Sequence, residues 1–109
     1  MRERAARRGI VYGAAVESGP LRADQPFQEA VLRECALLVP SWEMKWGQIE
    51  KQRGIRNHVV ANWIIDFARR NGLSTRGHTA VWHKNVPPWL EEALAGPNGS
   101  AVLAGHVRD

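Results

Sequence analysis

The stretch STRGHTAVWHKN, residues 74–85, decides the fold. It follows a helical pattern that ends at Gly72, and its first nine residues, 74–82, predict a β-strand. Because side chains alternate along a strand, one side of it carries Arg76, His78, Ala80 and Trp82. The imidazole nitrogens of His78 would then lie beside the flat indole ring of Trp82 at the end of the strand.

Helical and strand patterns alternate along the rest of the chain. We expect strands at residues 9–16, 41–46 and 74–82, and helices at residues 2–8, 24–38 and 59–72, with a helical turn or two within 86–96 and another helix from about 101. Residues 17–24 and 49–58 are expected to be loops. This order, with short connections, predicts parallel strands joined by right-handed crossovers. The carboxyl ends of such strands share one face, which carries the site in barrels and doubly wound sheets.

Two helices carry the expected core. The first is capped by Asp24, with Pro26 in its first turn, and has an apolar stripe of Phe27, Val31, Cys35 and Leu38. The second has an apolar face of Val60, Ile64, Phe67 and Ala68. Cys35 is the single cysteine, so an internal disulfide is excluded and we expect a small buried hydrophobic side chain there.

Composition excludes several classes of protein. The 109 residues are 44% hydrophobic and 24% charged, as in an ordinary globular domain, and no apolar run approaches the roughly 20 residues of a membrane span. The net charge is +4, and several arginines crowd near the N-terminus. A basic end of this kind is compatible with nucleic-acid binding, but a solvated helix face is favoured because Arg and Glu alternate and no nucleic-acid motif accompanies them. The four histidines are not spaced as metal ligands, so we expect no metal and no cofactor.

The chemistry is expected where the second and third predicted strands end. Parallel strands would gather there Trp42, Lys45, Trp46, His78, Trp82 and His83. Indoles cover the C–H face of a sugar ring, while histidine and lysine nitrogens bond its hydroxyls. The residues alone leave another interpretation open, in which the tryptophans belong to the core and His78 is a buried, hydrogen-bonded histidine. Trp63, on a helix face, is expected to be a core residue.

Two motifs at matching positions give this region a resemblance to a known family. RGHTAVWH at 76–83, followed by PPW, and PSWEMKW at 40–46 resemble the patterns RGHTLVWHSQ–PSW and PENxMKW of the family 10 glycoside hydrolases, the endo-β-1,4-xylanases. GAAV at 13–16 and IIDFARRNGL at 64–73 are similar to that family as well. The likeness runs from about Gly9 to the last residue.

The resemblance implies a (β/α)₈ barrel that cleaves internal β-1,4 bonds of xylan, or a related β-1,4-glycan, with retention of configuration. It implies that Lys45, His78 and Trp82 line the glycone side of the cleft, and that Trp46 and His83 support it. Members of the family are usually secreted or periplasmic. No clear signal peptide is visible in this chain, and we expect no membrane or nucleic-acid partner.

The sequence departs from the family pattern at three site positions. Ser41 and Trp42 stand where the family has a Glu-Asn pair, and Asn85 stands where it has Gln. Ser41 and Asn85 retain the ability to bond hydroxyls with a shorter reach, whereas Trp42 offers a stacking surface in place of an amide. The substrate-binding set implied for this chain is therefore Ser41, Trp42, Lys45, His78, Trp82 and Asn85. Glu43 falls on a variable position and is expected to be non-catalytic.

No residue of the sequence is assigned a catalytic role. Retaining glycosidases use two carboxylates roughly 5 Å apart, and in this family both follow later strands, beyond Asp109. A full barrel takes about 250 residues, so we expect residues 1–109 to be the N-terminal three βα units of an incomplete barrel, inactive and poorly stable alone. Two alternatives stay open: a non-catalytic β-glycan-binding fragment or degenerate homologue, and, less favoured, a small basic nucleic-acid-binding domain.

Overall fold

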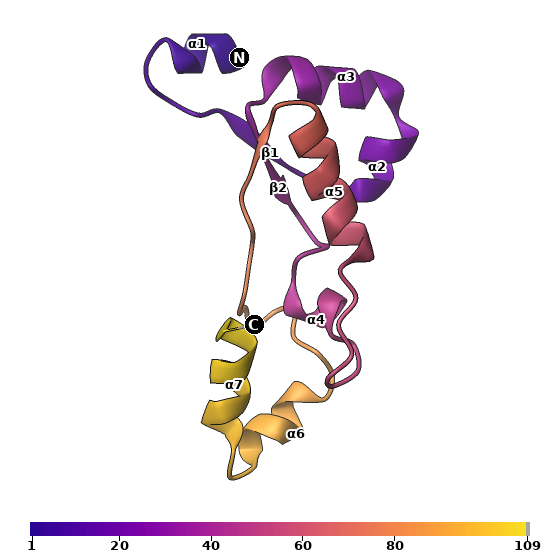
Figure 1. Cartoon of the computed structure of the whole chain (residues 1–109), viewed down its shortest axis with the longest axis vertical. Coiled ribbons are helices and arrows are strands. Elements are labelled where there is room, and N and C mark those ends of the chain that lie inside the picture. The colour runs from indigo at the N-terminus through magenta and orange to yellow at the C-terminus, as the bar shows by residue number, and fades with distance from the viewer. Residues whose placement is uncertain (109) are drawn as a thin grey trace.

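Residues 1–108 are described by a computed structural model, in which the chain is elongated, 52 × 31 × 21 Å. A three-stranded sheet with its helices occupies one end of the molecule, and the helices α4, α6 and α7 occupy the other (Figure 1). The strands are β1 Gly13–Val16, β2 Leu37–Pro40 and β3 Ser74–Thr75, in the order β1-β2-β3. Both strand pairs are parallel, so the predicted α/β fold with parallel strands is confirmed.

Seven helices accompany the sheet within residues 1–108. They are α1 Arg2–Ala6, α2 Ser18–Ala23, α3 Gln25–Glu34, α4 Trp46–Ile49, α5 Val59–Arg70, α6 Leu90–Ala95 and α7 Gly99–Arg108. The predicted cap of α3 is confirmed, because the Phe27 backbone N–H donates to Asp24 Oδ1 at 2.9 Å. The predicted end of α5 is confirmed too: Gly72 has φ 67°, a backbone conformation that favours glycine.

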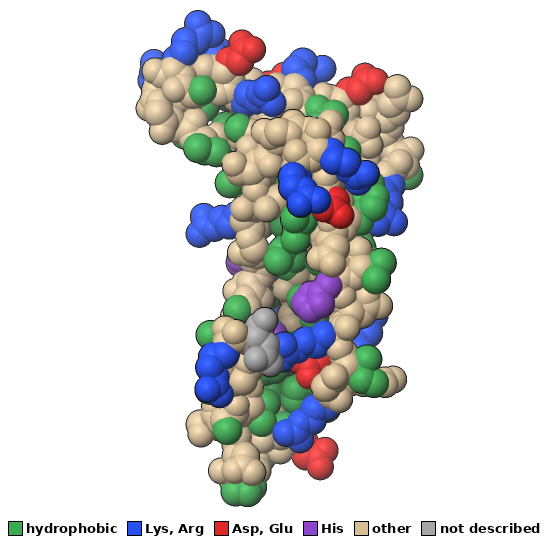
Figure 2. All heavy atoms as spheres, in the orientation of Figure 1, with side chains coloured by type: hydrophobic (Ala, Val, Ile, Leu, Met, Phe, Trp, Pro, Cys, Tyr) green, Lys and Arg blue, Asp and Glu red, His purple; other side chains and the backbone are tan. Residues whose placement is uncertain are grey.

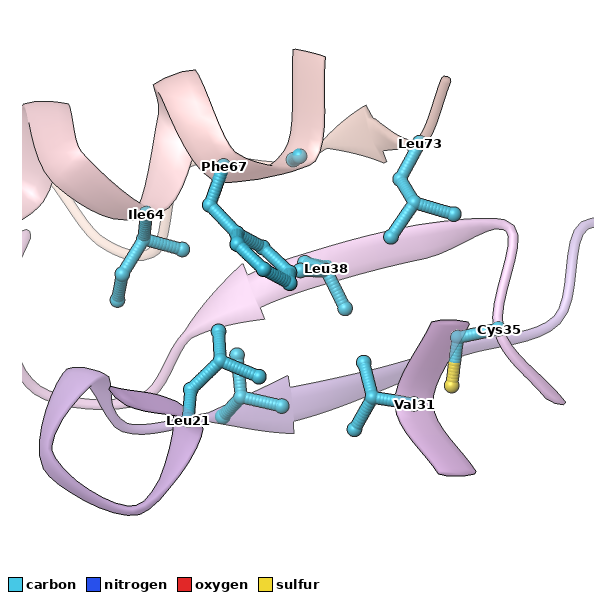
Figure 3. Close-up of a cluster of buried hydrophobic side chains, with 9 residues drawn as sticks. Leu21, Val31, Cys35, Leu38, Ile64, Phe67 and Leu73 are labelled. Atoms are coloured by element: carbon cyan, nitrogen blue, oxygen red, sulfur yellow. The ribbon is translucent and has the colours of Figure 1, made fainter. Parts of the chain in front are cut away.

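The main core lies where α2, α3 and α5 meet the sheet (Figure 3). Its buried residues are Val16, Leu21, Val31, Cys35, Leu38, Ile64, Phe67, Ala68 and Leu73. Leu38 and Ile64 are fully buried, and each such side chain contributes about 1.5–3 kcal/mol to folding. Burial raises the pKa of the Cys35 thiol, which agrees with its predicted place in the core. Two predicted core residues are wrong: Phe27 is 36% exposed and Val60 is 42% exposed.

The second strand lies earlier in the sequence than predicted. Strand β2 covers residues 37–40, whereas 41–46 form a turn and the start of α4, so the predicted strand at 41–46 and the predicted helix end at Leu38 are both wrong. Helix α3 ends at Glu34 because Cys35 already has extended dihedral angles. Gly13 permits the close pairing of β1 with β2, since a Cβ there would overlap the Leu37 carbonyl oxygen.

The third strand is far shorter than the predicted 74–82. Even-numbered residues of β2 face β3, and the Arg76 backbone N–H donates to the Leu38 carbonyl at 2.9 Å. The next donor on that side of β2 would be residue 40, but Pro40 has no N–H. Pairing therefore stops, and the chain after β3 runs away from the sheet toward α4 and α7 (Figure 1).

Smaller differences concern the connections. Helix α2 lies within the predicted loop 17–24, held by the fully buried Leu21. Strand β1 begins at Gly13 rather than at residue 9, and α7 begins at Gly99 rather than near 101. Residues 50–58 form a connection as predicted, apart from one isolated bridge between Gln52 and Ile55.

The basic N-terminal end is interspersed with acidic groups. The amino group of Met1 pairs with Glu34, which also accepts from Arg33 at 2.9 Å. Arg2 donates to the carbonyl oxygens of Leu32 and Cys35 at the end of α3. Figure 2 shows acidic side chains among the basic ones at this end of the molecule, which supports a solvated surface. Among residues 1–108, no helix combines the length and the apolar character needed to cross a bilayer.

Candidate functional site

Lys45 is the centre of the candidate site. It follows β2 through a tight turn in which its backbone N–H donates to the Trp42 carbonyl at 3.1 Å. The residue is only 5% exposed, and its ammonium group donates to the Ser41 carbonyl. An ammonium group has three donors, and this bond uses one of them. A buried cation is costly unless it has partners, and such a group is well suited to binding hydroxyl oxygens.

Two indoles flank this ammonium group. Lys45 Nζ lies 5.5 Å from the centroid of the Trp42 ring and 5.3 Å from that of Trp82, within the range of a cation–π interaction. Trp42 belongs to the turn after β2, and Trp82 belongs to the segment after β3. The two segments are more than thirty residues apart in sequence, so the fold brings together the residues that the sequence predicted to be neighbours.

His78 lies beside the same indole. Its ring centroid is 6.4 Å from that of Trp82, at an interplanar angle of 47°, and the side chain is exposed. His83, the other histidine of the RGHTAVWH motif, is also exposed. Its ring centroid lies 6.0 Å from that of Trp82. The exposed ring of His78 excludes the interpretation of this residue as a buried core histidine. We call Trp42, Lys45, His78 and Trp82 the Lys45 cluster.

Asn85 and Ser41 relate to this cluster in different ways. Ser41 contributes its carbonyl oxygen, which accepts from Lys45. Asn85 is turned toward α4: its carbonyl accepts from the Gly47 backbone N–H at 3.2 Å, and a Cβ built on Gly47 would lie 2.6 Å from Asn85 Oδ1. Within residues 1–108 that Oδ1 is buried without a hydrogen-bond partner. Gly47 therefore leaves room for the Asn85 amide, whose oxygen lies against α4 and does not face the Lys45 cluster.

The model of a family described as Glycosyl hydrolase family 10 matches residues 1–109. The chain belongs to glycosyl hydrolase family 10. The resemblance of the two motifs is thereby confirmed.

Relatives within family 10 are xylanases. Endo-1,4-beta-xylanase 3 of Hypocrea jecorina (strain QM6a) is 31% identical over 103 residues, which is 93% of this chain and 29% of that protein. Beta-1,4-xylanase of Dictyoglomus thermophilum is 42% identical over 74 residues, 66% of this chain and 20% of that protein. The chain thus spans less than a third of the length of each of these two relatives.

Solved structures of family 10 proteins share the fold. Xylanase 10B from Thermotoga maritima has a TM-score of 0.81 and 31% identity, covering 97% of this chain and 34% of that one. Xylanase 10B from Thermotoga petrophila RKU-1, solved in complex with xylobiose, has a TM-score of 0.81 and 30% identity over 97% of this chain and 33% of that one. The three strands and their helices are therefore the N-terminal part of a family 10 barrel fold.

Trp46, which follows Lys45 directly, is buried in an aromatic stack. It is 1% exposed, stacks on His106 with ring centroids 3.6 Å apart, and meets Trp89 edge-on at 5.8 Å. His106 in turn bonds the Ala80 carbonyl through Nε2 at 2.7 Å. This aromatic stack joins α4, which begins one residue after Lys45, to α7 and to the segment that carries His78 and Trp82.

Glu50 is a residue that sequence reasoning missed. It is 4% exposed and accepts from three donors: the Gly54 backbone N–H at 2.7 Å, Trp46 Nε1 at 3.0 Å and Arg56 Nε at 3.4 Å. Burial alone would raise the pKa of this carboxyl, but the three donors outweigh it and hold the pKa below its usual value. The spacing of Trp46 and Glu50 in the sequence could have indicated this contact, because residues four apart lie on the same face of a helix.

Glu43 was predicted to be non-catalytic, and its contacts give it a structural role. The Ser18 backbone N–H donates to Oε1 at 2.5 Å, and the Trp42 backbone N–H donates to Oε2 at 3.3 Å. Burial would raise the pKa of Glu43, yet these bonds leave it lowered. The carboxylate therefore ties the turn after β2 to the start of α2. Within residues 1–108, no group of three or more His, Cys, Asp and Glu side chains is placed to hold a metal ion.

Proposed function

We propose that this chain forms the glycone-binding part of a retaining endo-β-1,4-xylanase. The observation that carries the proposal is the buried ammonium group of Lys45 between the indoles of Trp42 and Trp82, with His78 at the edge. The indoles offer flat surfaces for the C–H faces of pyranose rings. Lys45 and His78 offer nitrogens for the hydroxyls at the rim of each ring.

The proposed ligand is xylan, or a related β-1,4-glycan. The named relatives are xylanases, and a family structure was solved with xylobiose. Ser41 and Trp42 replace the Glu-Asn pair of the family pattern, so recognition in this chain relies more on stacking than on amide hydrogen bonds. Because members of the family are usually secreted or periplasmic, we also propose that the protein acts outside the cytoplasm.

We propose further that residues 1–109 are the N-terminal portion of the catalytic barrel and bind glycan without cleaving it. Retaining hydrolysis needs an acid/base and a nucleophilic carboxylate roughly 5 Å apart. Glu43 and Glu50 lie near the Lys45 cluster, and each has a pKa below the usual value of a carboxyl group. Both accept hydrogen bonds from backbone or side-chain donors, and these bonds hold the local fold. A general acid requires the opposite shift, a raised pKa.

Titration with xylobiose, followed by NMR or calorimetry, tests the proposal. His78→Ala should weaken binding about tenfold, equivalent to about 1.4 kcal/mol, and its exposure makes it harmless to folding. Lys45→Ala should weaken binding at least as much, because hydrogen bonds to charged groups contribute about 1.5–3 kcal/mol. Arg8→Ala, which removes an exposed positive charge far from the cluster, is the matched control and should bind as the unmutated chain does.

The result that contradicts the binding proposal is equal xylobiose affinity in all four proteins, or no binding by the unmutated chain. Hydrolysis is tested separately. The purified chain should release no reducing sugar from xylan above a buffer control. Release above that control would overturn the proposal that the chain binds without cleaving.

A further inference from the structure

A cavity of about 580 Å³ lies next to the Lys45 cluster. Its walls are the start of α2, the turn after β2, and the segment from α4 to the first turn of α5. Figure 1 shows that first turn of α5 between α2 and α4. The volume lies within the usual range of small-ligand sites, about 300–1,000 Å³. None of the residues implied for sugar binding, except Trp42, lines it.

Trp42 is shared by the cavity and the cluster. Its side chain is 49% exposed and lines the cavity, while its ring also lies 5.5 Å from Lys45 Nζ. Ile55 and Val60, at 63% and 42% exposed, add apolar surface to the same cavity. An indole with flanking apolar groups is the kind of surface on which the C–H face of a sugar ring stacks. Trp42 is therefore the residue at which the cavity adjoins the Lys45 cluster.

The polar lining of the cavity is suited to hydroxyl groups. Glu43 accepts two backbone N–H groups, which leaves acceptor positions on a carboxylate that offers about four. Asn57 Oδ1 accepts from the Val59 N–H at 3.0 Å, which orients its amide and leaves the NH₂ group to donate. Gln48 and Gln52 add two amides that both donate and accept. Hydroxyls require this mixture of donors and acceptors.

We propose that this cavity is a further subsite, which holds one neutral sugar unit of the glycan by stacking on Trp42 and by hydrogen bonds to Glu43, Gln48, Gln52 and Asn57. The inference rests on the proposed function. A neutral unit is favoured over an acidic one because two carboxylates, Glu17 and Glu43, line the cavity against one ammonium group, that of Lys51. Trp42 stands where the family pattern has Asn, so the stacking wall is a feature of this chain.

Titration of the 109-residue chain with xylobiose and with xylotetraose tests the subsite. We expect xylotetraose to bind at least tenfold more tightly than xylobiose. Gln52→Ala should reduce that gain to threefold or less and leave the xylobiose affinity unchanged. Gln52 is exposed, so its substitution leaves the core intact. The matched control is Gln25→Ala, which removes an exposed glutamine on α3 and should keep the full gain.

A second measurement does not depend on a variant. The side-chain amide NMR signals of Gln48, Gln52 and Asn57 should shift with xylotetraose and stay in place with xylobiose. The subsite is overturned if xylotetraose binds no more tightly than xylobiose, or if Gln52→Ala leaves the difference in affinity between the two sugars unchanged. In either case, weaker xylobiose binding by His78→Ala would still uphold the proposed function. Absence of binding by either sugar overturns both.

Discussion

Replacing Glu50 by glutamine should destabilise the half of the molecule that holds the candidate site. The Glu50 carboxylate is 4% exposed and accepts from Trp46 Nε1, from the Gly54 backbone N–H and from Arg56 Nε. Glutamine has nearly the same shape but replaces one oxygen by an NH₂ group. Whichever way the amide turns, a donor then faces a donor, and the negative charge opposite Arg56 is lost.

The size of the effect follows from these contacts. Hydrogen bonds to a charged group contribute about 1.5–3 kcal/mol each, and a buried donor left without a partner costs about 1–3 kcal/mol. The lost hydrogen bond and the unpartnered donor are two descriptions of the same broken contact, so their costs are not added. We therefore expect a loss of about 2 kcal/mol in the free energy of unfolding. At about 4–8 °C per kcal/mol for a domain of this size, the midpoint of thermal unfolding should fall by about 8–16 °C.

Urea unfolding at neutral pH, followed by tryptophan fluorescence, measures this loss. Glu91→Gln, at an exposed position on α6, is the matched control and should change stability by less than about 0.5 kcal/mol. The pKa of Glu50 is lowered in the folded chain, so its contribution is present above the ordinary pKa of 4.5 and is lost as the pH falls below it. The difference between the two proteins should therefore shrink in acid. A loss below about 0.5 kcal/mol, or one that grows in acid, would refute this account of Glu50.

Two further predictions concern the sheet. Leu38→Ala removes a fully buried side chain and should lower the free energy of unfolding by about 2–5 kcal/mol in urea titration. The control Val11→Ala, at a position 65% exposed, should change that free energy by less than about 0.5 kcal/mol. Similar losses in both variants would contradict the core described above. Gly13→Ala places a Cβ against the Leu37 carbonyl oxygen and should raise amide hydrogen exchange across β1 and β2, and unchanged protection there would contradict that close pairing.

The alternation of three parallel strands with the helices α1, α3, α5, α6 and α7 could be predicted from the sequence, but helices α2 and α4 and the ends of the strands could not. The apolar spacing of Val31, Cys35 and Leu38 fits one helical face, and it continues by coincidence past the true helix end at Glu34. The strand that follows is only four residues long, and a short apolar run carries no period that separates it from a buried helix. The end of β3 depends on Pro40, a residue of the neighbouring strand, which no local pattern in residues 74–82 records.

Most of the candidate site could be predicted because its motifs are matched residue by residue to a family pattern. Lys45, Trp82 and His78 lie together as expected, but turns place them and the predicted strands do not. The error in secondary structure did not change the prediction, since both arrangements carry the residues past the same edge of the sheet. Trp42 was expected at the site from the strand order and stood out as a departure from the family pattern, but its contact with the neighbouring cavity required the structure.

The support of the site depends on contacts that have no sequence pattern. Helix α4 follows Lys45 directly, and it is fixed through Trp46 to His106 on α7 and to Glu50. His106 reaches back to the Ala80 carbonyl, between His78 and Trp82. Beyond the end of the β2–β3 ladder, the two turns that form the Lys45 cluster are thus held by this aromatic stack and by the hydrogen bond from the Gly47 N–H to the Asn85 carbonyl. Loss of that stack should loosen the contact of Lys45 with Trp82 even with the core around Leu38 intact, so xylobiose affinity should fall in Glu50→Gln before the sheet unfolds.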